Sequence, residues 1–168
     1  MPFDPSSGRP SATGRARHDL EAYVRGLPPT PRPAGAYVPV TEAGALAFTA
    51  GHTHAVQGVL THRGTVGAPD GPAAEDAREC ARLAVRNCLA SLAHHLDGLG
   101  RVAQVVSMTG YVAAAQGFTA HPGVLDGASE ELLDAFGEDG RPSRAAVGVT
   151  SLPDGAVVEI SLVVALRS

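Results

Sequence analysis

The period of the hydrophobic pattern changes along the chain and divides it into predicted strands and helices. Apolar residues recur at helical spacing from about Ala73 to Leu96 and from about Gly123 to Phe136, which predicts two long helices. A shorter helix is predicted from His18 to about Leu27. Extended, β-rich runs surround the helices: AYVPV, ALAFTAG, GVLTHRGTVG, VAQVVSMTGYVAAA, RAAVGVTSL and AVVEISLVVAL.

The predicted order β-β-β-α-β-α-β-β favours an α+β fold. It has too few crossover helices for a wound parallel sheet, so we expect a mixed sheet with two long helices packed on one face. Residues 18–168 would form a single domain. Residues 1–17 are rich in Pro, Ser, Gly and Arg and are predicted to be a disordered leader that assembly does not need.

The last two predicted strands can be followed residue by residue. Alternation places one apolar set on the face expected to lie beneath the helices: Val158, Ile160, Leu162, Val164 and Leu166. A hairpin with its turn at Asp154 and Gly155 would pair Thr150 with Glu159. Arg144 and Glu159 would then share the face without helices, but roughly 20 Å apart along the strands. Within one chain they should not touch.

The face of this hairpin that lacks helices is half apolar. Leaving it in water would expose an unusually large apolar patch, so we expect a partner subunit to cover it. An arginine and a glutamate from different subunits would then be able to meet across that contact.

Composition narrows the class of partner. The chain has 168 residues, a formal net charge of −4 and a pI of about 5.9, which argues against a surface for nucleic acid or for an anionic membrane. It has four Phe, three Tyr and no Trp, so no basic and aromatic strand for RNA is visible.

No secretory signal is visible. Cys80 and Cys88 lie too far apart on a helix for a disulfide, and two reduced cysteines fit the cytoplasm.

The chain contains no lysine, because all thirteen of its basic residues are arginine. Schiff-base chemistry from the protein is therefore excluded, and a carboxylate must be recognised by arginine or by backbone amides. His52, His54 and His62 could together bind zinc, but no Cys, Asp or Glu nearby completes a persuasive set, so we predict no metal and no cofactor. His52 could instead line a cleft.

Three segments resemble one family. AGAYVPV, then FTAGH, then RAAVGVTSLPDGAVVEI are similar to the G-x-Y, S-G-Q and R-x-x-V-x-V-x-x-L-P-x-x-x-x-V-E-I segments of the reactive-intermediate deaminase (Rid/YjgF) superfamily. Asn87 and VVSMTGYV also fit in order and spacing, so the resemblance covers about Pro33 to Leu166. It implies a chorismate-mutase-like fold, a homotrimer with clefts between subunits, and hydrolysis of enamine or imine intermediates that carry a carboxylate, with release of ammonia.

Carried over by position, the resemblance implies that Arg144 holds the substrate carboxylate, that Glu159 orients the attacking water, that Tyr37 lines the cleft and that Gly51 offers its backbone. The residue types suit these roles. A guanidinium presents two parallel donors to a carboxylate, and a partly buried carboxyl has a raised pKa that suits proton transfer. The alternatives are a surface arginine that closes a strand and a glutamate that forms an interfacial ion pair or caps a helix.

The sequence departs from the family pattern at three pocket positions. Ala50 replaces the serine, His52 replaces the glutamine, and Ala146 replaces a cysteine, while the asparagine near the start of the second helix corresponds to Asp126 or its neighbour. Three functions therefore stay open: the deaminase, a ligand-binding trimer without catalysis, and a specialised biosynthetic enzyme. The third would use the same cleft for a larger, less polar substrate, for which Ala50 and Ala146 would make room.

Overall fold

The computed structural model describes residues 19–167, so the predicted leader lies outside the described residues. The elements follow the predicted order after a short first helix: α1 (Leu20–Arg25), β1 (Val40–Ala43), β2 (Leu46–Thr49), β3 (His52–Thr53), α2 (Ala74–Leu96), β4 (Val102–Ala113), α3 (His121–Phe136), β5 (Ser143–Val149) and β6 (Val158–Leu166). Short 3₁₀ turns lie at Gly137–Gly140 and Pro153–Gly155. The predicted α+β class and the two long helices are confirmed.

The sheet is mixed and has the order β1-β2-β6-β4-β5, with β3 also paired to β6. The long strand β4 lies between β5 and β6, parallel to β5 and antiparallel to β6. The predicted hairpin of the last two strands is therefore wrong, and Glu159 pairs with Tyr111 and Thr53 rather than with Thr150. Because α3 is a crossover helix, β5 can run parallel to β4, and β6 then pairs on both of its edges.

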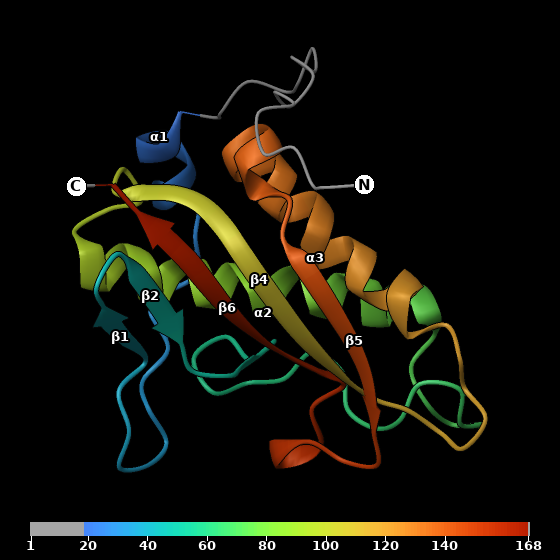
Figure 1. The fold of residues 1–168 in the computed structure, drawn as a ribbon. Coiled ribbons are helices and arrows are strands. Elements are labelled where there is room, and N and C mark those ends of the chain that lie inside the picture. The colour runs from blue at the N-terminus through green and yellow to red at the C-terminus, as the bar shows by residue number, and fades with distance from the viewer. Residues whose placement is uncertain (1–18, 168) are drawn as a thin grey trace, which may run out of the picture.

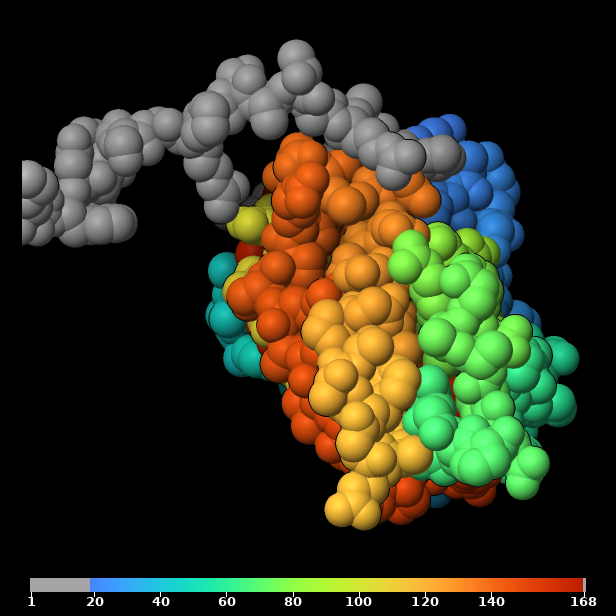
Figure 2. Space-filling view, turned by 90° about the vertical axis from the view of Figure 1, so that its right-hand side faces the viewer, coloured from blue at the N-terminus to red at the C-terminus, as the bar shows by residue number. Residues whose placement is uncertain are grey.

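Both long helices cover the same face of the sheet, as Figure 1 shows behind the strands. Every second residue of β6, from Val158 to Leu166, points to that face and is buried. The alternate residues, which point to the other face, are half-buried, as the alternation predicted. From the side, α3 and the first half of α2 lie next to each other (Figure 2). The hydrophobic core therefore lies between the sheet and this helical layer.

No described element covers the opposite face of the sheet. Phe48 pairs with Val163 on this face and both are half-buried, while Val147 on β5 is exposed. We refer to this surface as the open face. Its mixture of apolar and small polar side chains is the feature from which we predicted a covering subunit.

Two segments differ from the predicted strands. GVLTHRGTVG forms only isolated bridges, Val56 to Val59 and Val66 to Ala114, because glycines such as Gly64, with φ of 106°, interrupt any extended run. The third strand is instead the two-residue β3. The first strand starts at Val40, so Tyr37 lies in the preceding turn and not in a strand.

A short N-terminal helix is attached to the helical layer by a charged network. The Tyr23 hydroxyl of α1 donates to Glu131 Oε1 at 2.6 Å, and Glu131 is only 5% exposed. Arg82 and Arg86 of α2 pair with the same carboxylate at 3.1 and 2.8 Å.

Within residues 19–167, no helix is both long and apolar enough to cross a bilayer.

Candidate active site

A β-bulge next to β6 brings Gly51 against Glu159. Phe48 pairs with Val163 and His52 with Ile160, so four residue steps on one side face three on the other. The Thr49 hydroxyl accepts the hydrogen bond of the Leu162 amide at 2.9 Å where the ladder is interrupted. Bulges of this kind often lie beside active sites, where they redirect one residue.

The extra residue leaves Gly51 packed on the Glu159 side chain. A β-carbon at position 51 would lie 2.9 Å from the carboxyl carbon of Glu159 and would overlap its Oε1. Only glycine therefore leaves the carboxylate in its present place. This contact unites two residues that the resemblance had assigned to one cleft, although they are 108 positions apart.

Glu159 lies on the open face of the sheet, where it pairs with Tyr111 of β4. It is half-buried, and burial raises the pKa of its carboxyl above the ordinary value. Its carboxylate forms no hydrogen bond or ion pair with another described residue. A carboxyl with a raised pKa and no partner is suited to take and return a proton.

Arg144 belongs to a second cluster, between β5 and α3. Its Nη1 donates to Asp126 Oδ1 at 2.8 Å and to Ser129 Oγ at 2.9 Å. These partners place the Arg144 side chain on the helical side of the sheet, so its predicted position on the open face is wrong. The physical reason is that β5 pairs in parallel with β4, which reverses its faces relative to a hairpin.

The two clusters do not meet within one chain. Arg144 pairs with Met108 and Glu159 with Tyr111 on the strand between them. They are separated by two strand spacings, roughly 10 Å, and by three residues of rise, also roughly 10 Å. Because their side chains also point to opposite faces, Arg144 and Glu159 do not come together within the described chain.

The other predicted site residues divide between these surroundings. Ala50 belongs to the bulge and its amide donates to the Pro39 carbonyl at 2.8 Å. Ala146 is half-buried on the same side of β5 as Arg144. Tyr37 is 49% exposed, and its hydroxyl accepts a hydrogen bond from the Ala34 amide at 3.3 Å.

His52 points away from Glu159. It pairs with Ile160, which faces the helices, and only 8% of it is exposed. Burial lowers the pKa of its imidazole to about 4, and its Nε2 has no hydrogen-bond partner among the described residues. Asn87 lies against the same strand and donates to the Thr53 and Ala55 carbonyls, both at 2.8 Å. The neutral His52 ring is thus part of the packing under β3.

Sequence reasoning named Asp126 only as the counterpart of a family asparagine and missed Ser129. The signal was present in part, because positions 126 and 129 share one face of a helix. Which strand that face meets depends on β5 lying beside α3, and the sequence pattern did not show this.

The two cysteines and His54 are packed in the core. Burial raises the pKa of the Cys80 and Cys88 thiols to about 11 and about 12, so both are protonated fillers of the core. His54 is fully buried, with Nε2 3.0 Å from the His62 carbonyl oxygen. Residues 19–167 contain no group of three or more His, Cys, Asp or Glu side chains arranged to hold a metal ion.

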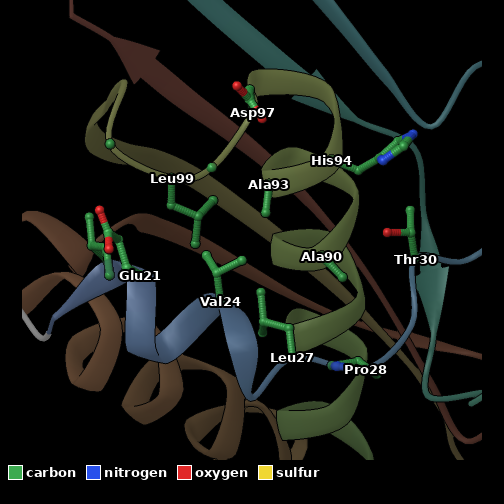
Figure 3. A pocket seen from close by; sticks show the side chains of 13 residues that line it. Glu21, Val24, Leu27, Pro28, Thr30, Ala90, Ala93, His94, Asp97 and Leu99 are labelled. Atoms are coloured by element: carbon green, nitrogen blue, oxygen red, sulfur yellow. The ribbon is translucent and has the colours of Figure 1, made fainter.

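A separate cavity of about 640 Å³ lies between α1 and the C-terminal end of α2. Figure 3 shows Val24 of α1 and Leu27, which follows that helix, directed toward Ala90, Ala93 and Leu99. None of the predicted site residues lines it. It is therefore distinct from the surroundings of Glu159 and of Arg144.

Comparison with known proteins identifies relatives along almost the whole described chain. The family described as "YjgF/chorismate_mutase-like, putative endoribonuclease" matches residues 19–166. Protein TCP17 of Trypanosoma cruzi is 36% identical over 164 residues, which cover 94% of this chain and 98% of that protein.

Solved structures share the fold. A "putative endoribonuclease" from Shewanella oneidensis MR-1 has a TM-score of 0.80 and 31% identity, covering 88% of this chain and 96% of its own. Atu1372 from Agrobacterium tumefaciens, a protein of unknown function, has a TM-score of 0.75 and 34% identity, with 79% and 83% covered. The YjgF gene product of E. coli, at 21% identity with 83% and 94% covered, has a TM-score of 0.56 and shows the fold alone.

Proposed function

Because this chain belongs to the YjgF/chorismate-mutase-like family, we propose that it hydrolyses small enamine or imine compounds that carry a carboxylate, giving a keto acid and ammonia. The observation that carries the proposal is Glu159. This carboxyl has a raised pKa, lacks a partner among the described residues and is placed by the glycine of a bulge. Such a group suits a reaction in which one proton must be taken from water and given to nitrogen.

The chemistry needs only these groups and water. Water adds to the C=N carbon as Glu159 accepts a proton from it, and the C=N electron pair moves to nitrogen. Glu159 returns this proton to nitrogen, and the proton of the new hydroxyl passes to the leaving nitrogen as the C–N bond breaks, giving the ketone and ammonia. The guanidinium of Arg144 would hold the substrate carboxylate throughout, since a paired, planar cation stays charged when water is excluded.

The active assembly in this proposal is a homotrimer of a cytoplasmic protein. In one chain the side chains of Arg144 and Glu159 lie on opposite faces of the sheet, so Arg144 of one subunit would meet Glu159 of the next. The apolar residues of the open face, including Phe48 and Val163, support the presence of a covering subunit. Tyr37, exposed in its turn, would line the same cleft.

A ligand-binding trimer without catalysis is the second candidate. Ala50 and Ala146 favour it, because they supply neither hydroxyl nor thiol at two pocket positions. A specialised biosynthetic enzyme would use the same two alanines as space for a larger substrate. We do not propose an endoribonuclease, the activity in the names of some relatives, because a net charge of −4 and a pI of about 5.9 disfavour an RNA-binding surface.

Ammonia release from 2-iminopropionate or 2-iminobutyrate, generated in place, tests the proposal. The protein should accelerate release above the spontaneous rate. Arg144→Ala should lose carboxylate binding, worth roughly 2–5 kcal/mol. Glu159→Gln should bind normally but turn over slowly, because it keeps the shape and loses the proton acceptor. Binding of pyruvate without any ammonia release would favour the non-catalytic trimer.

Mixing the two variants tests the shared site. A site that takes Arg144 from one subunit and Glu159 from the next would be intact in about one quarter of positions after random exchange. Activity should therefore return in part. If the mixture stays inactive while wild-type trimers exchange normally, the shared geometry is wrong. A monomer in light scattering at micromolar concentration would contradict the trimer itself.

A further inference from the structure

Arg144 already has a carboxylate partner in its own chain. Both hydrogen bonds of its guanidinium to described side chains leave from Nη1, to Asp126 and to Ser129. The Nε and Nη2 groups lie on the opposite edge, which can donate two parallel hydrogen bonds to one carboxylate. The anchored arginine is thus held by one nitrogen and keeps its bidentate edge for a ligand.

We propose that Asp126 is a specificity-determining residue of this site. The inference rests on the proposed role of Arg144 as the carboxylate clamp. A ligand carboxylate on the Nε and Nη2 edge would lie next to the negative charge of Asp126. This charge disfavours a ligand that is only an anion and favours one whose carboxylate is next to a cationic nitrogen. The site therefore selects zwitterions, such as the protonated imine of a 2-keto acid.

The expected size of the effect follows from Coulomb's law. Charges on the two sides of a guanidinium are separated by roughly 6 Å, and the effective dielectric constant lies between about 20 near a protein surface and about 80 in bulk water. The side chain of Arg144 is 24% exposed and that of Asp126 is 48% exposed, which fits an environment between these two limits. One charge of the ligand then changes its affinity by about tenfold.

Alanine and lactate are suitable probes, because they differ only in an ammonium or a hydroxyl group next to the carboxylate. Their dissociation constants can be measured by ligand-observed NMR titration of the full chain. The wild-type protein should bind alanine more tightly than lactate. Asp126→Asn keeps an acceptor for Nη1 but removes the charge, so lactate should gain about tenfold while alanine changes little. Asp126→Glu should keep the wild-type preference.

A matched control is Glu138→Gln, which removes the same formal charge from an ion pair with Arg141, just before β5. Its ratio of lactate to alanine affinity should equal that of the wild type. An unchanged ratio in Asp126→Asn would overturn the inference. Arg144→Ala distinguishes failure of the specificity role of Asp126 from failure of the carboxylate-binding role of Arg144. If it loses both probes while Asp126→Asn keeps the wild-type ratio, only the specificity inference falls. If Arg144→Ala binds both probes normally, the clamp and the proposed function fall together.

Discussion

Replacing Gly51 with alanine tests whether the bulge positions Glu159. The new β-carbon would lie 2.9 Å from the carboxyl carbon and 3.2 Å from Cγ, where ordinary contacts are 3.4–4 Å. It would also overlap Oε1. The carboxylate must therefore move by roughly 1 Å or more, and a displacement of this size in an active site costs about 100-fold in rate.

The fold should tolerate the same substitution. Gly51 is not among the glycines with positive φ, so alanine can adopt its backbone conformation. The atoms in the way are the far end of a flexible side chain, and a strained rotamer costs about 1 kcal/mol. Replacing glycine with alanine also reduces the conformational freedom of the unfolded chain, which stabilises the folded state by about 0.4–1 kcal/mol. The net change in unfolding free energy should thus be within about 1 kcal/mol.

The assay is ammonia release from 2-iminopropionate, measured together with thermal unfolding. Gly100→Ala is the matched control, because Gly100 has no heavy atom within 4 Å of the added carbon and no positive φ. The control should be active and stable. Wild-type turnover in Gly51→Ala would refute the role of Glu159 at this position. Loss of the folded state would instead refute the analysis of the packing.

Two predictions concern stability. The pKa of His52 falls from 6.5 to about 4 on burial, so the unfolded chain binds the proton first as pH falls. The stabilisation is complete above pH 6.5 and declines by about 3 kcal/mol on acidification to pH 4. Urea unfolding across this range should show the decline, and His52→Gln should flatten it; parallel curves would contradict the assignment. Tyr23→Phe removes the donor to buried Glu131 and should cost about 1 kcal/mol of unfolding free energy. An unchanged denaturant midpoint would show that Arg82 and Arg86 satisfy this carboxylate alone.

Long periodic segments could be predicted closely from the sequence. The structure has α2 at Ala74–Leu96 against a predicted start at about Ala73, and β6 shows the predicted alternation. In these segments many apolar residues follow one helical or strand period, so the local sequence is enough to identify the buried face. The third strand could not be predicted, because two paired residues carry no period. The bulge before it depends on the ladder with β6, which lies more than 100 residues away.

The order of the last strands required tertiary information. A hairpin of β5 and β6 and the observed insertion of β4 between them bury the same apolar face of β6, so the alternation cannot distinguish them. The two arrangements differ in whether the backbone groups on both edges of β6 are paired. Between β2 and β4, the ladder groups of β6 pair on both sides, which a strand at the edge of a sheet cannot achieve. A short turn such as PDG suggested the hairpin but does not require it.

The motif resemblance named Arg144 and Glu159 by position, but their surroundings follow from strand order. With β4 between β5 and β6, the arginine lies beside Asp126 on α3 and the glutamate lies on the open face. Each group then retains an unused capacity: the Nε and Nη2 edge of the guanidinium, and an unpartnered carboxyl with a raised pKa. Had the predicted hairpin formed, both would lie on one face and an apposed subunit would have to bridge them along the strands. The observed topology separates them by face, so the proposed trimer requires a neighbour that packs against the β5 edge and presents its own Glu159 to Arg144.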